Sequence, residues 1–263
     1  MRIEQYGRFY KTDSMGYLIN ESTTSNISPY FQPSIDLVKR VLVETDVNDV
    51  THSLYLRGSV PRGLAIPDIS DVDMFALTNC DDIASQALED QVRQKLFQSQ
   101  TKIDFRVYTL NEALNMPDWY IRFVVKVLST CVLGIDLGSS IRSFKPNSQI
   151  LAGYALLEDS LVTCELKLAE PYVNTQHLCS WIAKQIVRAG LAISIDREGR
   201  FTPDLYLCYT VFKKWYPNRS EDMLEALDLA INPTSNKMVV KNLIGGLGHW
   251  LARECKCILM KNS

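Results

Sequence analysis

Paired carboxylates are the sequence feature best suited to chemistry in this chain. Asp71 and Asp73 flank Val72 at the beginning of an apolar run, Met74 to Leu77. Residues two positions apart in a strand point to the same face, so this pair would place two negative charges side by side. Such a pair needs a cation, and carboxylate oxygens suit Mg²⁺, which completes its shell with water and substrate phosphates. Taken alone, an Asp-x-Asp sequence is more often the solvated entrance of a strand.

A glycine-serine turn lies upstream of the carboxylates. The apolar run Leu54 to Leu56 leads through Arg57 into Gly58 and Ser59. Because glycine has no Cβ, its backbone can approach a phosphate closely, while the serine offers a hydroxyl and an amide. Arg57 and Arg62 bracket the turn and are weaker candidates to add positive charge to a phosphate site. A Gly-Ser at a strand end is common, so the turn alone predicts little.

The combination of turn and carboxylates is far more specific than either part. Leu56 to Leu77 contains a strand, a Gly-Ser turn, a loop, a carboxylate pair and a second strand. This order resembles the signature of the nucleotidyltransferase superfamily, which includes polymerase β and the antibiotic nucleotidyltransferases. The resemblance implies that Gly58 and Ser59 hold the triphosphate of a nucleotide. It also implies that Asp71 and Asp73 bind Mg²⁺.

The superfamily places a third acidic residue on a later strand, where it binds metal or accepts the proton of the attacking hydroxyl. Asp104, within the predicted strand Lys102 to Leu110, matches this position. The implied reaction transfers a nucleoside monophosphate, most simply AMP from ATP, to a hydroxyl of a small-molecule acceptor and releases pyrophosphate. Two Mg²⁺ ions would bridge the triphosphate to the carboxylates. Neither the acceptor nor the base of the nucleoside triphosphate is fixed by the sequence.

The elements that must position these residues form an α/β unit. Hydrophobic spacing and turn residues predict helices over Pro33 to Thr45 and Asp81 to Gln98, and strands over Ser53 to Leu56, Val72 to Leu77 and Lys102 to Leu110. A hairpin turn is predicted around Thr12 to Gly16. From residue 111 onward the pattern predicts helices, apart from the irregular stretch Gly134 to Pro146.

The second half of the chain has helical periodicity. The predicted helical segments are Ile150 to Cys164, Leu178 to Ala189, Tyr206 to Trp215, Asp222 to Ile231 and Met238 to Ile258. The fold class is therefore α+β, with a polymerase β-like mixed-sheet domain over residues 1–140 and a helical bundle over residues 141–263. Such a bundle also resembles the antibiotic nucleotidyltransferases, which implies that Glu158, Asp159 or Glu165 contributes to acceptor binding.

Composition limits the partners and the compartment. The 263 residues include 28 basic and 30 acidic side chains, giving a formal charge of -2, so no broad basic surface is expected to hold long nucleic acids. The seven cysteines lack the paired spacing of a zinc site and indicate reduced thiols. With no apolar signal core and no membrane-length apolar run, we expect a soluble cytoplasmic protein without a membrane partner.

The sequence leaves two other functions open and disfavours a third. One is a non-catalytic nucleotide-binding or antitoxin-like interaction protein, although retention of all three carboxylates argues against it. A second is an enzyme that nucleotidylates a protein or an RNA. A helical ribonuclease is disfavoured because the Arg-then-His motif of that class is absent. A homodimer is compatible with the sequence, but no heptad or exposed apolar stripe argues for one.

Overall fold

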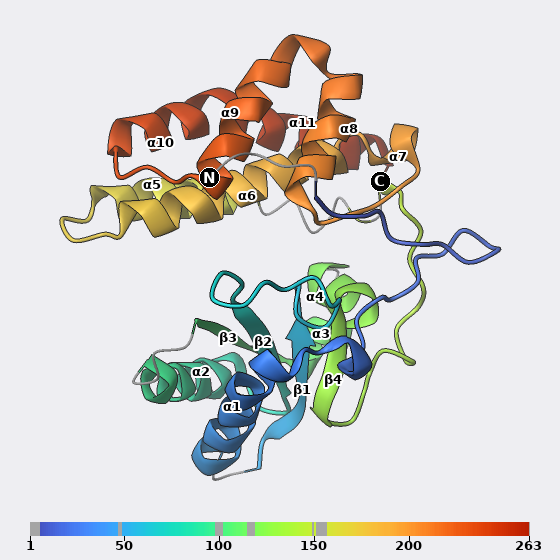
Figure 1. Cartoon of the computed structure of the whole chain (residues 1–263), viewed down its shortest axis with the longest axis vertical. Coiled ribbons are helices and arrows are strands. Elements are labelled where there is room, and N and C mark those ends of the chain that lie inside the picture. Colours follow the sequence, from blue (N-terminus) through green and yellow to red (C-terminus); the bar gives the residue numbers. More distant parts are fainter. Residues whose placement is uncertain are drawn as a thin grey trace. The chain divides into compact units, whose positions relative to one another are not determined.

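The computed structural model describes residues 6–46, 49–97, 102–114, 119–148, 150 and 157–262. The chain divides into two compact units (Figure 1). The sheet unit spans Ile19–Phe144, and the helical unit combines the described part of Met1–Leu18 with that of Lys145–Ser263. Among the described residues, no helix has the length and hydropathy needed to cross a membrane.

A four-stranded mixed sheet forms the centre of the sheet unit. Its strands are β1 (Thr51–Arg57), β2 (Val72–Thr78), β3 (Ile103–Thr109) and β4 (Ser129–Gly134). They lie in the order β3-β2-β1-β4, with β1 antiparallel to both of its neighbours and β2 parallel to β3. The three predicted strands are therefore all present, each within one or two residues of its predicted bounds.

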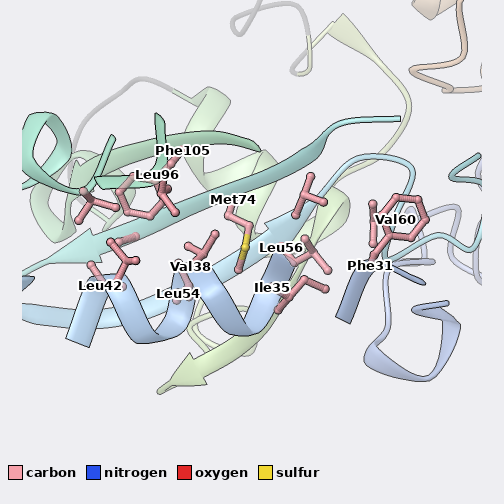
Figure 2. Packing of buried hydrophobic residues seen from close by; sticks show 14 of the residues in the cluster. Phe31, Ile35, Val38, Leu42, Leu54, Leu56, Val60, Met74, Leu96 and Phe105 are labelled. Atoms are coloured by element: carbon pink, nitrogen blue, oxygen red, sulfur yellow. The ribbon is translucent and has the colours of Figure 1, made fainter. Parts of the chain in front are cut away.

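Two helices cover one face of this sheet. Apolar residues at helical spacing on α1 (Gln32–Thr45) and α2 (Asp82–Phe97) pack against alternating apolar residues of β1, β2 and β3 (Figure 2). Among the packed side chains are Ile35, Val38, Leu42, Leu54, Leu56, Met74, Leu96 and Phe105. Because side chains alternate along a strand, burying this set leaves the intervening residues on the opposite face.

The fourth strand was not predicted. Past β3 the chain forms the short helices α3 (Leu110–Leu114) and α4 (Trp119–Phe123), then a π-helical turn over Val124–Leu128 that leads into β4. The expectation of helices alone after residue 111 is therefore wrong. The strand is an edge strand of six residues with a bulge in its pairing to β1, and only one of its residues is buried. Such a strand lacks the alternation that periodicity detects.

The helical unit is built around α6. Its helices are α5 (Leu157–Ala169), α6 (Thr175–Ala192), α7 (Ile195–Glu198), α8 (Leu205–Trp215), α9 (Ser220–Ile231), α10 (Lys237–Leu243) and α11 (His249–Asn262). Helix α6 packs against α5, α8, α9 and α11, which explains why it is buried along most of its length. The α+β class predicted from the sequence is confirmed.

Two predicted helical segments need comment. Residues 151–156, including Leu151 and Tyr154 of the first segment, lie outside the described residues. The segment Met238 to Ile258 is not one continuous α-helix, since a π-helical turn over Ile244–Gly248 separates α10 from α11. This turn contains three glycines, and the absence of a Cβ at these positions lowers the steric cost of the wider π-helical winding.

The N-terminal segment packs with the helical unit, whereas residues 1–140 were expected to form one domain. The main-chain N–H of Tyr10 donates to the carbonyl oxygen of Phe201 at 2.9 Å, and their rings lie 5.6 Å apart. The Thr202 hydroxyl donates to the Arg8 carbonyl oxygen at 2.8 Å. The predicted hairpin is reduced to a single bridge between Thr12 and Leu18, because residues 8–10 bond elsewhere.

Candidate active site

Two carboxylates and one guanidinium belong to a single row across three strands. Asp73 of β2 is paired in register with Asp104 of β3 and, on its other side, with Arg57 of β1. Residues opposite one another on adjacent strands point to the same face of a sheet. That face is opposite the one covered by α1 and α2, because the alternating neighbours Leu56, Met74 and Phe105 are in the core.

The glycine-serine turn lies directly against this row. Gly58 follows the last residue of β1 and has a φ of +83°, which favours glycine. A Cβ added at Gly58 would lie 2.7 Å from Oδ2 of Asp73, so any larger residue would displace that carboxylate. Ser59, the next residue, is partly exposed, and its carbonyl oxygen accepts a hydrogen bond from Leu64 at 3.0 Å. Gly58 of the turn therefore lies close against the Asp73 carboxylate.

Arg57 lies among the carboxylates. One of its terminal nitrogens is 3.9 Å from Oδ2 of Asp104, and the other donates to the Tyr120 hydroxyl at 3.4 Å. Burial opposes the charge of Arg57, but the neighbouring hydroxyls of Tyr120 and Tyr108 and the carboxylates Asp73 and Asp104 raise its pKa overall. The guanidinium is therefore charged at every accessible pH and compensates part of the negative charge of the row.

A second arginine is tied to the edge of the sheet. Arg106 lies two residues after Asp104 on β3, with its Nε 3.7 Å from Oδ1 of that carboxylate. Its terminal nitrogen donates to Oε1 of Glu89 at 3.1 Å, and the other oxygen of Glu89 accepts the N–H of Val107 at 2.7 Å. Glu89, from α2, thus covers a main-chain donor of an edge strand and fixes Arg106.

The remaining predicted site residues are placed differently. Asp71 is exposed and precedes the first residue of β2, and Arg62 is 5% exposed in the turn that follows Ser59. Within the described ranges, no group of three or more His, Cys, Asp or Glu side chains is arranged to hold a metal ion. The structure thus brings Asp73 and Asp104 together with the Gly58 turn, without assembling all three carboxylates into one cluster.

The donor set nevertheless fits Mg²⁺. This ion is usually bound by one or two carboxylates together with substrate phosphates and water, so a pair of carboxylates is sufficient on the protein side. Asp73 and Asp104 supply such a pair, and the side chain of Asp104 is 42% exposed and therefore accessible to a ligand. The backbone of Gly58 adjoins the pair, at the position that suits a phosphate group.

Sequence reasoning missed two residues that shape the site. Glu89 falls on the buried face of α2 with Leu88 and Val92, and an acidic residue at such a position signals a buried partner. That signal was readable from the helical spacing. Tyr120 gives no comparable signal, because its contact with Arg57 joins segments 63 residues apart in the sequence.

Acidic residues of the helical unit gather around a histidine. His249, at the start of α11, has its ring nitrogens 3.8 Å from Glu158 and 3.5 Å from Glu165, both on α5. Lys256 lies 3.5 Å from the other oxygen of Glu158. Asp159 is exposed. Two of the three acids considered as acceptor ligands, Glu158 and Glu165, are thus engaged with basic side chains of the same unit.

The fold and the arrangement of carboxylates define the class of protein that this chain resembles. A mixed sheet with two aspartates on adjacent strands beside a glycine turn, accompanied by a helical unit, is the nucleotidyltransferase fold. The crystal structure of spectinomycin adenyltransferase AAD(9) from Enterococcus faecialis with ATP and spectinomycin is similar, with a TM-score of 0.54 and 14% sequence identity. The match covers 86% of this chain and 99% of that chain. The predicted resemblance to antibiotic nucleotidyltransferases is confirmed at the level of the fold.

Sequence comparison alone does not reach this result. No family model matches the chain, and no curated protein matches it significantly. The similarity is therefore carried by the backbone arrangement.

Proposed function

We propose that this protein is a nucleotidyltransferase that moves a nucleoside monophosphate, AMP from ATP, to a hydroxyl of a small-molecule acceptor and releases pyrophosphate. The observation that carries the proposal is the register pairing of Asp73 with Asp104 beside the Gly58 turn. It is supported by the fold shared with an adenyltransferase whose structure contains ATP and spectinomycin.

Each site residue has a role that follows from its position. The backbone of Gly58 and the hydroxyl and amide of Ser59 would bind the triphosphate, with Arg57 and Arg62 adding positive charge. Asp73 and Asp104 would hold Mg²⁺, with Asp71 contributing from the end of the preceding loop. When bound, Mg²⁺ supplies charge neutralisation for the triphosphate and orients it. Asp104, whose side chain is 42% exposed, would also accept the proton of the acceptor hydroxyl.

The proposal extends to partners and compartment. The near-neutral charge balance favours a small acceptor over a long nucleic acid, since a polymer would require a broad basic surface. The reduced cysteines fit a cytoplasmic enzyme, and the seven thiols are all free among the described residues. A homodimer would be compatible with this proposal.

Calorimetric titration tests the proposal directly. Purified protein is titrated with non-hydrolysable ATP and GTP analogues, with Mg²⁺ and with EDTA, and the same is done for an Asp73→Asn/Asp104→Asn variant. We expect binding that depends on Mg²⁺ in the wild type and is lost in the variant. Asp36→Asn, an exposed aspartate on α1, is the matched control and should bind as the wild type does.

Two results would count against the enzyme. A folded wild type that binds neither analogue would contradict the nucleotide site itself. Binding that is unaffected by EDTA and by the double substitution would favour the non-catalytic nucleotide-binding protein. Once metal-dependent binding is established, ATP labelled at its α-phosphate and a panel of hydroxyl acceptors would identify the product.

A further inference from the structure

The carboxylate row contains its own cation. Asp73 and Asp104 place two negative charges on adjacent strands, and Arg57 occupies the same row on the next strand. Like charges this close repel one another strongly unless a positive charge lies between or beside them. Arg57 provides that charge within the protein, with its guanidinium 3.9 Å from Asp104.

The backbone of Arg57 is held on both sides, by pairing with Asp73 of β2 and Ser129 of β4. Its guanidinium lies 3.9 Å from Asp104 and donates to the Tyr120 hydroxyl at 3.4 Å. Both distances exceed the roughly 2.7–2.9 Å of a charge-assisted hydrogen bond. A side chain anchored in this way can change its partner without any change in the strand.

The neighbouring arginine does not have this freedom. Arg106 also approaches Asp104, but it is bound at 3.1 Å to the carboxylate of Glu89, whose side chain is only 6% exposed. Glu89 also pairs with Arg93 at 3.2 Å, so Arg106 divides its charge between Glu89 and Asp104. Arg57, in contrast, lies in the carboxylate row itself, in register with Asp73.

We propose that Arg57 is a built-in counter-ion of the metal-binding carboxylates, which weakens their affinity for a free divalent cation and is released to the triphosphate when metal and nucleotide bind together. The inference rests on the proposed function and concerns the regulation of the same site. A cation already beside Asp73 and Asp104 repels a second one, and a triphosphate offers the guanidinium a stronger partner. Metal therefore enters as the metal–nucleotide complex rather than alone.

Manganese titration of the full-length protein without nucleotide tests this role. Mn²⁺ substitutes for Mg²⁺, and electron paramagnetic resonance reports the free ion, so no turnover is needed. We expect Arg57→Gln to bind Mn²⁺ at least about tenfold more tightly than the wild type, a difference of ~1.4 kcal/mol. Arg57→Lys keeps the charge and should stay within about twofold of the wild type, in line with a charge effect.

The control variant separates the local effect from net charge. Arg40→Gln removes the same charge from an exposed position on α1, which covers the opposite face of the sheet. It should leave Mn²⁺ affinity unchanged. In a second titration at saturating Mn²⁺, Arg57→Gln should bind the non-hydrolysable ATP analogue about tenfold more weakly, because the released guanidinium is missing.

Equal Mn²⁺ affinity in the wild type and in Arg57→Gln would overturn the inference, as would tighter binding in Arg57→Lys. If the wild type still binds nucleotide in that case, only the counter-ion role fails. If the wild type binds neither Mn²⁺ with nucleotide nor nucleotide alone, the proposed function fails with it. Circular dichroism checks folding, and Arg57→Met provides a second neutral variant should Arg57→Gln not fold.

Discussion

Replacing Gly58 with alanine tests whether the turn holds Asp73 in place. Gly58 has a φ of +83°, and an L-residue in this left-handed region costs ~1–2 kcal/mol. The new Cβ would also lie 2.7 Å from Oδ2 of Asp73, whereas ordinary contact begins at 3.4 Å, so the carboxylate must retreat by the difference, 0.7 Å. Gly58→Ala therefore carries both a backbone cost and a displacement of Asp73, the proposed metal ligand.

Gly63→Ala is the matched control. Gly63 belongs to the same unit and has a φ of +68°, but its Cβ would meet its nearest neighbour, the Asn26 carbonyl oxygen, at an ordinary 3.4 Å. Both variants should lose ~1–2 kcal/mol of unfolding free energy in urea denaturation. Only Gly58→Ala should also weaken Mg²⁺-dependent binding of the ATP analogue, by at least about tenfold, since misplacements near 1 Å cost up to ~10²-fold.

Comparing nucleotide binding by the two glycine variants tests whether Gly58 constrains Asp73. Equal nucleotide binding in Gly58→Ala and Gly63→Ala would show that Asp73 is not constrained by Gly58, and the turn would then act only through its backbone. Equal loss in both would mean that the whole turn, rather than its approach to Asp73, positions the ligand. Either result would refute the reasoning from the 2.7 Å contact.

Three further substitutions probe the surroundings of the site. Glu89→Gln weakens the bond to Arg106 and should lower the unfolding free energy in urea by ~1–3 kcal/mol. Tyr55→Phe removes the hydroxyl that accepts the buried N–H of Leu137 at 2.7 Å, with a similar expected loss. Burial raises the pKa of Tyr108 to about 12 in the folded protein, whereas the pKa in the unfolded chain is ~10. The protonated Tyr108 hydroxyl therefore contributes its full stabilisation below pH ~10, and this contribution is lost as the pH rises to about 12. Tyr108→Phe should therefore lose less stability than the wild type over that window, measured by denaturation at each pH.

The parts of the fold that the sequence could predict are those with a clear hydrophobic period. Helices α1 and α2 and strands β1, β2 and β3 each have one face in the core, so apolar spacing marks them. The motif order also placed Gly58, Asp73 and Asp104 at ends of strands. The pairing of Asp73 with Asp104 in register could not be predicted in this way, because register depends on which strands become neighbours.

The missed features depend on contacts between distant segments. Strand β4 gains its conformation from pairing with β1, and the segment around Tyr10 from its bonds to Phe201. Asp71 was expected to share a strand face with Asp73, and β2 begins one residue later, at Val72. Because element boundaries commonly differ by a residue or two, the shared face of Asp71 and Asp73 stays a prediction.

The topology explains why the site is compact although its residues span Arg57 to Asp104. Since β1 runs antiparallel to β2, the end of β1 meets the beginning of β2, and the parallel β3 begins at the same edge. The last residue of one strand and the second residues of two others therefore form one row. Two of these three residues are acidic and one is basic, so the row keeps a net negative charge that Arg57 reduces but does not cancel. Under the proposed function, this net charge would attract a divalent cation, and the cation would be held tightly only when a triphosphate adds further ligands.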